Sequence, residues 1–511
     1  MLWEANEAMN QATLALQEGD AAAARTRMEE ARSLLGEGAT FEHAGYLLAL
    51  EGELALVEGK PSTALARFDR LQGVEGRWSA RWWADFGRAR ALAAAGRDSD
   101  ADEAFERALD ALEGGAAALD PLVGRPYFLG DRDEVYDRYL LHLLDRGRVT
   151  EAFAVSERSR TRATRRDRGL VRGTDEELGG LLDRVVLARA ALREHEEGEA
   201  FVGPEGRGAW EGDRRDRIDA LVRAQAALAA AERERVPGET SPTDPAAEAV
   251  AAVGQLGSSA RLLAYHATAS ELVLFAVGGS GIVAFREPVG RLDLEAGVDV
   301  WRIAVGAGGG DPAADALGDL LLPAELERIP DGLLVIAPHG PLHGLSFPLL
   351  RRDGRFLVED HPLSMVPGAS ALTAALASPP CTGGGAVVAA DPDGDLRFAR
   401  EEGRDVASRS EGAELLLGDQ IDSAAVREAL ARACSFHFAG HAVVDPDLPQ
   451  HSHLRLAGGD RLTWIDLQSL EVRPDLVVLS ACETGRGMTP AAGERWGLAT
   501  GFLAAGASTV V

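Results

Sequence analysis

The sequence lacks the features that mark a membrane-spanning, exported or nucleic-acid-binding protein. No segment of its 511 residues approaches the roughly 18 consecutive apolar residues of a transmembrane helix. The first residues lack the basic, apolar and small-residue pattern of a signal peptide. Basic residues are in deficit, 53 against 81 acidic ones, for a formal net charge of -28. This charge disfavours binding to nucleic acid or to an anionic membrane, and it favours a soluble protein.

Cysteine is scarce, with only Cys381, Cys434 and Cys482 in the chain. So few cysteines fit a reducing cytosol better than a disulfide framework, which predicts a cytoplasmic protein. Cys434 begins a predicted buried strand and is interpreted as a small apolar residue. Cys381 falls in a predicted loop and has no assigned role. A reducing compartment would also keep a cysteine nucleophile in its free thiol form.

Runs of β-branched residues are almost absent from Met1 to about Arg168. Alanine, leucine and charged residues at helical spacing predict that this region is all helix. A glycine followed by a polar residue begins four segments with shared features: an alanine lies five residues after each glycine, a large apolar residue lies nine after it in three of the four, and a small or apolar residue lies twelve after it. The four sets begin at Gly19 (Ala24, Met28, Ala31), Gly59 (Ala64, Phe68, Leu71), Gly96 (Ala101, Phe105, Ala108) and Gly147 (Ala152, Ser156, Ser159).

These shared offsets resemble the tetratricopeptide repeat, in which each helix-turn-helix unit buries its face by stacking on the next. The glycines lie further apart than the usual ~34 residues. We therefore expect longer helices and one insertion around Gly114 to Asp131. The predicted repeat domain, residues 1–172, would dock a protein regulator or a substrate. A plain helical bundle with incidental glycine turns is the alternative.

The rest of the chain predicts three further segments. Residues 173–235 are highly charged and interrupted by GPEGRGAWEG, which predicts a helical hairpin. The proline-rich stretch VPGETSPTDPA predicts a linker over residues 236–250. Residues 251–511 begin with three short apolar runs typical of a β-meander and continue with alternating helices and strands. That alternation predicts an α/β domain with a mainly parallel sheet flanked by helices.

Two short apolar runs in this domain end beside reactive side chains. Ser435–Ala439 and Leu476–Ala481 have the length of buried parallel strands, and His441 and Cys482 follow them. Chemistry in open α/β sheets collects past the carboxyl ends of the strands, so neighbouring strands would bring this imidazole and thiol together. A nearby base raises the thiolate fraction of a thiol, whose free pKa is about 8.5. The pattern predicts Cys482 as a nucleophile and His441 as its base.

The motifs around the pair, HFAGHA at 437–442 and LSACETG at 479–485, resemble the CHAT domain, a caspase-like cysteine protease module related to separases. The resemblance extends upstream through LLVIAPHGPLHGLSFPLL, VVAADP and LLLG, and we take it to cover about Val250 to the end. It implies a cysteine endopeptidase in which the backbone N–H groups of Ala442 and Cys482 hold the oxyanion. Some bacterial relatives act in defence signalling, for instance on gasdermins.

One position departs from the family pattern. The family usually has glycine directly after the catalytic histidine, where this chain has Ala442. Alanine keeps the N–H donor, and it is penalised only if the position requires a positive φ. The rival hypothesis is a scaffold or adaptor protein without catalytic activity, in which the repeats and the caspase-like domain only mediate protein–protein contacts.

The sequence predicts neither a cofactor nor a metal. A zinc site from His437, His441, His451, His453, Cys434 and Cys482 lacks the usual spacing, and strand alternation points its members to opposite faces. Asp391, Asp393, Asp395 and Glu402 approach a calcium-loop pattern, but the glycine is misplaced, so we expect an acidic turn. His339 and His343 are expected to be satisfied loop or core histidines. The final residues, GASTVV, begin an apolar strand, and we expect the native chain to continue beyond Val511.

Overall fold

The computed structural model describes most of the chain and separates it into two compact units. One unit comprises Met1–Leu119 and Asp131–Arg148, and the other is built mainly from Val149–Val511. The described residues are 2–36, 41–73, 79–116, 132–161, isolated positions between 181 and 227, 244–322, 332–444, 452–468, 470, 472, 474–481 and 497–511.

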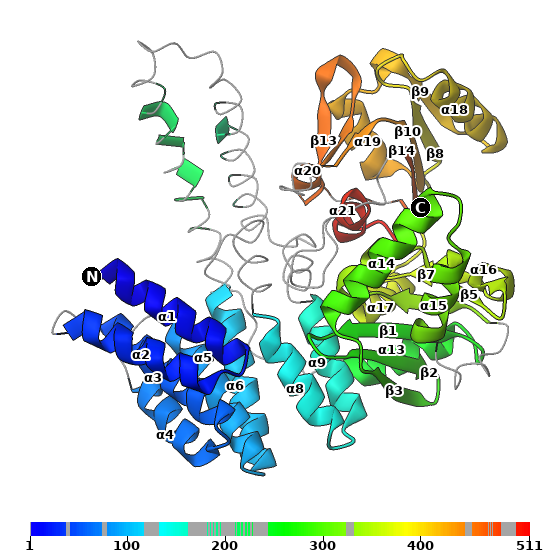
Figure 1. The fold of residues 1–511 in the computed structure, drawn as a ribbon. Helices are drawn as coiled ribbons and strands as arrows, with labels where there is room; N and C mark the ends of the chain where they lie inside the picture. The colour runs from blue at the N-terminus through cyan, green and yellow to red at the C-terminus, as the bar shows by residue number, and fades with distance from the viewer. Residues whose placement is uncertain are drawn as a thin grey trace. The chain divides into compact units, whose positions relative to one another are not determined.

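The first unit is helical, as predicted from its composition (Figure 1). Its described helices are α1 (Leu2–Gln17), α2 (Ala21–Leu35), α3 (Phe41–Val57), α4 (Pro61–Gln72), α5 (Ser79–Ala94), α6 (Asp98–Ala116) and α8 (Glu134–Leu144). Each helix of this series contacts the next one in it. The predicted insertion at 114–131 lies outside the described residues beyond Ala116, where α6 ends.

The four glycine turns lie where the repeat pattern predicts them. Gly19, Gly59, Gly96 and Gly147 have φ values of 77°, 70°, 72° and 69°, in the left-handed region that favours glycine. Each turn joins two helices, and the last of them joins α8 to α9 (Val149–Thr161). The twelve positions at the shared offsets are all buried: Ala24, Met28, Ala31, Ala64, Phe68, Leu71, Ala101, Phe105, Ala108, Ala152, Ser156 and Ser159.

The second unit contains two five-stranded sheets, where the sequence predicted one (Figure 1). The first has the order β3-β2-β1-β4-β7. Its strands are β1 (Arg261–Ala267), β2 (Leu272–Gly278), β3 (Gly281–Glu287), β4 (Leu334–Ala337) and β7 (Leu363–Met365). The predicted meander forms the antiparallel part, and β4 and β7 add in parallel. Alternation of elements predicts strands, but it does not specify which strands pair.

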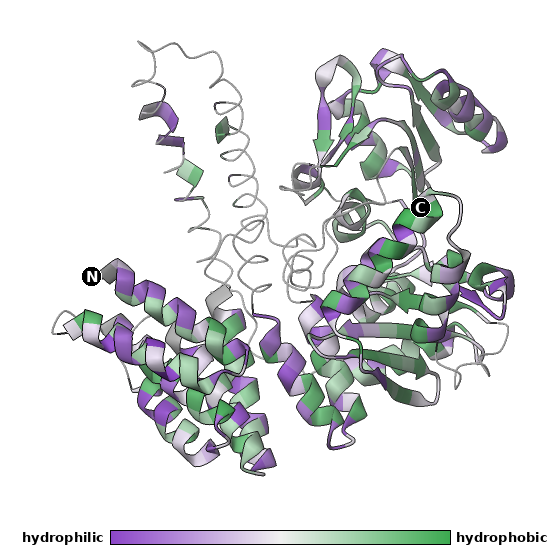
Figure 2. Ribbon diagram, in the orientation of Figure 1, coloured by the Kyte–Doolittle hydropathy of each residue, from purple (hydrophilic) through white to green (hydrophobic). Residues whose placement is uncertain are grey.

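Helices cover both faces of this first sheet. The inward residues of α14 (Arg291–Gly306) and α15 (Asp311–Leu321) share one apolar core with Leu263, Tyr265 and Leu274 of the strands. On the other face, Phe153 of α9 packs edge-on against Phe275 of β2. α13 (Pro245–Gln255) and α17 (Ala369–Ala377) pack with α9 on that side. In Figure 2, much of the ribbon of these strands is coloured as hydrophobic.

The predicted linker at 236–250 does not remain a linker throughout. The Asp244 carboxylate accepts a hydrogen bond from the Ala246 N–H (3.0 Å), and Pro245 occupies the first turn, so α13 begins inside the predicted segment. α13 buries Ala246, Ala249 and Val253 against the rest of the unit. The proline that suggested a linker here marks a helix start instead.

α9 belongs to the second unit, although its glycine turn and offsets placed it in the predicted repeat domain. Its polar residues are buried there. Ser156 Oγ is hydrogen-bonded to His266 Nδ1 (3.0 Å), and Arg160 donates to the Pro338 carbonyl (2.6 Å). The Ala369 N–H donates to the Glu157 carboxylate (2.7 Å). Arg160, near the end of this helix, is buried as well.

The second sheet is all parallel, with the order β15-β14-β10-β8-β9. Its strands are β8 (Ala386–Ala390), β9 (Glu414–Leu417), β10 (Ser435–Gly440), β14 (Leu476–Ala481) and β15 (Thr509–Val510). The helices around it include α18 (Arg397–Arg409), α19 (Ser423–Arg432) and α21 (Leu498–Ala505). This sheet matches the predicted fold class, and it carries the candidate site.

Some sequence predictions concern residues outside the described part. They include most of the hairpin at 173–235, His451 and Cys482. Within the hairpin, the rings of His195 and Trp210 stack with centroids 4.8 Å apart. Among the helices that the structure describes, none combines the length and the apolarity needed to cross a membrane.

His339 shows how polar groups are buried in the first sheet. It follows β4, its ring stacks on His266 with centroids 4.3 Å apart, and its Nδ1 accepts the Ala267 N–H (3.2 Å). This confirms it as a satisfied core histidine. Burial holds its pKa well below the ordinary value, and the charges of His266 and Arg160 lower it further.

We expect this histidine to make the second unit less stable in acid. Below about pH 6.5 the unfolded chain binds a proton at His339 that the native state does not bind, so stability is lost as the pH falls. His339→Gln, which keeps an acceptor for the Ala267 N–H, should flatten the fall in melting temperature between about pH 7.5 and 5.5. His361→Gln, at a half-buried histidine of the same unit, serves as the control. Equal pH slopes in all three proteins would contradict the prediction.

Candidate functional site

β10 and β14 are neighbours in the second sheet, as the sequence predicted. They run parallel in a register that pairs Ser435 with Leu476 and continues to Gly440 with Ala481. His441 follows the carboxyl end of β10 directly. Cys482 follows Ala481 in the chain and lies outside the described residues. The structure therefore confirms the neighbouring strands and places one of the two predicted reactive side chains.

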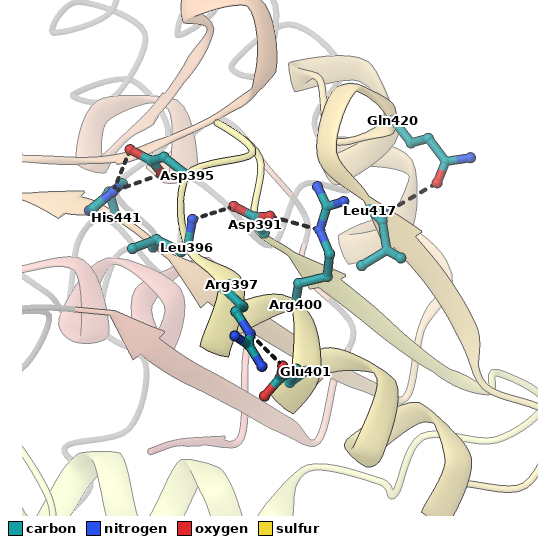
Figure 3. A network of polar contacts seen from close by, with 9 residues as sticks. All are labelled: Asp391, Asp395, Leu396, Arg397, Arg400, Glu401, Leu417, Gln420 and His441. Atoms are coloured by element: carbon teal, nitrogen blue, oxygen red, sulfur yellow. Dashed lines mark hydrogen bonds and ion pairs between the residues drawn. The ribbon is translucent and has the colours of Figure 1, made fainter.

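His441 is held by contacts on two sides. Its Nε2 lies 3.2 and 3.4 Å from the two carboxylate oxygens of Asp395, in the segment that follows β8 (Figure 3). Its backbone carbonyl accepts the Arg455 N–H (3.0 Å). The imidazole is about 30% exposed, so it is supported by protein and still open to a substrate. The sequence pattern suggested Asp395 only as a possible calcium ligand and does not predict this contact.

Ala442 keeps a backbone donor beside His441. It begins β11 (Ala442–Val443), which pairs antiparallel with β12 (His453–Arg455), next to β13 (Arg461–Thr463). Because Arg455 and His441 form a hydrogen-bonded pair, Ala442 and Leu454 form the non-hydrogen-bonded pair that follows. The Ala442 N–H is therefore directed away from β12. Ala442 is not among the described non-glycine residues with positive φ, so alanine causes no backbone strain there.

Glu402 of α18 ties the two strands together on the face that carries His437. One oxygen of its carboxylate lies 2.9 Å from His437 Nε2 on β10, and the other accepts the Ser480 hydroxyl on β14 (3.0 Å). The neighbouring Gly403 allows this close approach, because a Cβ there would lie 2.4 Å from the Ala390 Cβ of β8. Strand alternation could have shown that His437 and Ser480 share a face, but not that Glu402 reaches them.

Residues 311–511 match the family model described as the CHAT domain. The second unit thus contains a CHAT domain. This confirms the family suggested by HFAGHA and LSACETG, although the match begins later than the predicted start near Val250 and leaves β1–β3 before it. No curated protein matches the sequence.

Among solved structures, the chain is similar to a chain of the Saccharomyces cerevisiae separase-securin complex, with 10% sequence identity and a TM-score of 0.34. The similarity covers 93% of this chain and 50% of the matched chain. The protein therefore spans about half the length of that relative.

The other two cysteines of the chain form a disulfide at the opposite end of the CHAT domain's sheet. Cys381 and Cys434 are bonded, with Cα atoms 5.3 Å apart. Cys434 precedes β10, whereas His441 follows it, so this disulfide is not part of the site. The expectation of a free, small apolar Cys434 and an unassigned Cys381 is wrong. Cysteine spacing cannot predict pairing across 53 residues. Because two of the three cysteines are paired, the small number of cysteines does not indicate a reducing compartment.

The described residues of the zinc and calcium sites considered from the sequence have separate partners in the structure. His437 contacts Glu402, Cys434 is in the disulfide, and the Asp391 carboxylate binds the Leu396 N–H and Arg400. Asp393, Asp395 and His441 do bring ligand atoms within 4.8 Å of one another. Asp393 also forms an ion pair with Arg455 (3.3 Å). Neither the zinc set nor the calcium loop converges on one point among the described residues.

We predict that the protein purified without reductant has one titratable thiol after denaturation and three after reduction. The pair Cys381–Cys434 accounts for the difference, and Cys482 is the remaining thiol. Cys482→Ser should leave no titratable thiol before reduction, which makes it the matched control. Peptide mapping of the unreduced protein should recover the Cys381–Cys434 link. Three free thiols in the unreduced wild type would contradict the structure.

Proposed function

We propose that the CHAT domain is a cysteine endopeptidase in which Cys482 is the nucleophile and His441 is the general base. The observation that carries the proposal is the pairing of Gly440 with Ala481 at the ends of two parallel strands. Consecutive Cα atoms lie ~3.8 Å apart and neighbouring strands ~4.8 Å apart. The residues that directly follow this pair therefore start from the same edge of the sheet.

The residues at this edge supply the parts of an acyl-transfer reaction. The Cys482 thiol gives its proton to His441, and the thiolate attacks the scissile carbonyl carbon. The carbonyl electrons move onto oxygen, where the Ala442 and Cys482 N–H groups stabilise the oxyanion. When the tetrahedral intermediate collapses, the C–N bond breaks and His441 protonates the leaving amine. Water, deprotonated by His441, then hydrolyses the thioester and regenerates the thiol.

The helical repeats are proposed to bind a protein that regulates this activity or presents its substrate. The stacked helix pairs of the first unit are the architecture that other repeat proteins use as a docking surface. A partner that binds one conformation of the protein better than another would change turnover by shifting the population of conformations. A role in bacterial defence signalling, with a protein substrate, is the biological context that the CHAT resemblance suggests.

The alternative function is a scaffold that binds partners without catalysis. Two features distinguish these functions, because a scaffold needs neither a carboxylate beside its histidine nor a backbone N–H that is directed away from the neighbouring strand. The carboxylate at His441 Nε2 and the N–H at Ala442, which points away from β12, favour the protease.

The decisive variants act on the two proposed catalytic residues. Cys482→Ala should abolish peptide cleavage and labelling by an electrophilic peptide such as an acyloxymethyl ketone, and His441→Ala should lower cleavage nearly as far. The double variant should be hardly worse than either, because the two residues act as one unit. Cleavage and the labelled site are measured by mass spectrometry over a peptide library.

Two controls separate chemistry from folding. Cys434→Ala breaks the disulfide, which lies at the ends of the strands remote from His441, and His361→Ala removes a histidine that contacts the Gly332 carbonyl before β4. Both should keep activity at temperatures where the protein is folded. If Cys482→Ala keeps wild-type cleavage, or if wild type shows neither cleavage nor labelling with the repeats' partner present, the scaffold function replaces the protease.

A further inference from the structure

We propose that Asp395 is a positioning residue that fixes the orientation and the tautomer of His441. The inference rests on the proposed function only in taking His441 as the base. The carboxylate oxygens of Asp395 lie 3.2 and 3.4 Å from His441 Nε2, which is hydrogen-bonding distance for a ring N–H (Figure 3).

The choice of nitrogen has a chemical consequence. A deprotonated carboxylate only accepts hydrogen bonds, so the neutral imidazole that binds it carries its proton on Nε2. Nδ1 then keeps a free lone pair, and it is the atom that receives the thiol proton. When that proton moves from Cys482 Sγ to Nδ1, the ring becomes a cation. Asp395 retains its hydrogen bond and stabilises that cation without itself becoming protonated.

The loop that carries Asp395 is held by a buried carboxylate. Asp391 is only 2% exposed, and its φ of 58° lies in the left-handed region, which few residues other than glycine adopt. One carboxylate oxygen accepts the Leu396 N–H (2.9 Å), and the other accepts Arg400 Nε of α18 (2.8 Å). The Asp391 N–H donates to the Ala439 carbonyl of β10 (2.8 Å). Figure 3 shows Asp391 between the loop and α18.

This arrangement couples the loop to the strand that ends at the histidine. Asp391 is anchored to Ala439, two residues before His441, and it closes the loop onto Leu396, the residue after Asp395. Both ends of the Asp395–His441 contact are thus fixed to β10. A residue with an unfavourable φ persists where hydrogen bonds from the surrounding structure hold its backbone in place, and such residues cluster at functional sites.

The neighbouring carboxylates have other partners in the molecule. Asp393 pairs with Arg455 (3.3 Å), and Glu402 bridges His437 and Ser480. Asp395 is the carboxylate whose described hydrogen bonds go to His441. Glu401 of α18 serves as the control, since its carboxylate pairs with Arg397 (2.8 Å) and is about half exposed.

The test compares Asp395→Asn, Asp395→Glu and Glu401→Gln in the full chain. Asp395→Asn should lower kcat for a cleaved peptide about 10- to 100-fold, as do changes to groups that orient a functional histidine, with KM changed less than about twofold. Asp395→Glu, which restores the carboxylate, should recover part of the loss, and Glu401→Gln should keep near wild-type kcat. The side chains of Asp395 and Glu401 are both more than half exposed, so all three variants should fold with nearly unchanged melting temperatures.

A second readout does not depend on cleavage. In protein labelled with ¹⁵N-histidine, the Nε2–H proton of His441, assigned by its loss in His441→Gln, should exchange with water more slowly in wild type than in Asp395→Ala. If wild type cleaves no peptide but shows this difference, the proposed function fails and the positioning contact stands. Equal exchange, or unchanged kcat in Asp395→Asn, would overturn the inference. Loss of cleavage in EDTA with recovery on adding Zn²⁺, Ca²⁺ or Mn²⁺ would also overturn it, since Asp395 would then be a metal ligand.

Discussion

The candidate site depends on the parallel pairing of β10 with β14. The pairing runs through six residues of each strand, and the offset between paired residues equals the offset between His441 and Cys482. A slip of one residue would break this correspondence and turn every side chain of the slipped strand to the other face of the sheet. Buried Phe436, Phe438, Val477 and Leu479 set the register, because a slip would also remove them from the core. The apolar pattern that stabilises the sheet thus also aligns the site.

The same alternation divides each strand into a core side and a polar side. Phe436 and Phe438 point into the core, and the intervening His437 meets Glu402 of α18. On the next strand, Ser480 meets the other oxygen of the same carboxylate. The segment from Asp391 to Glu402 supplies this carboxylate and the one on His441. The sheet therefore supplies the alignment, and the loop and helix after β8 supply the electrostatic support.

The sequence predicted features that depend on local patterns. The helices of the first unit follow from their spacing of apolar residues, and the four glycine turns follow from residues that tolerate positive φ. The strand Leu476–Ala481 and the approximate extent of β10 follow from short apolar runs. His441 was found because a reactive residue directly follows such a run. Each of these features is decided by fewer than about 20 consecutive residues.

The features that the sequence did not predict are contacts between distant segments. The division into two sheets, the Cys381–Cys434 bond and the burial of α9 each depend on which elements meet in space. Asp395 and Glu402 belong to the same class, since each acts on a strand tens of residues away. Acidic residues in a loop after a strand are common, so composition alone could not distinguish the one that contacts His441 from its neighbour Asp393.

An engineered disulfide crosslink tests most directly whether the residues that follow Gly440 and Ala481 lie side by side. In His441→Cys, the introduced cysteine and Cys482 would each follow one of two neighbouring parallel strands. The spacing of such strands, ~4.8 Å, lies within the Cα–Cα separation of about 4.4–6.8 Å that a disulfide requires. Mass spectrometry of the mildly oxidised, unreduced variant should find a disulfide between position 441 and Cys482 alongside the Cys381–Cys434 bond. Recovery of both residues as free thiols under these conditions would contradict the account.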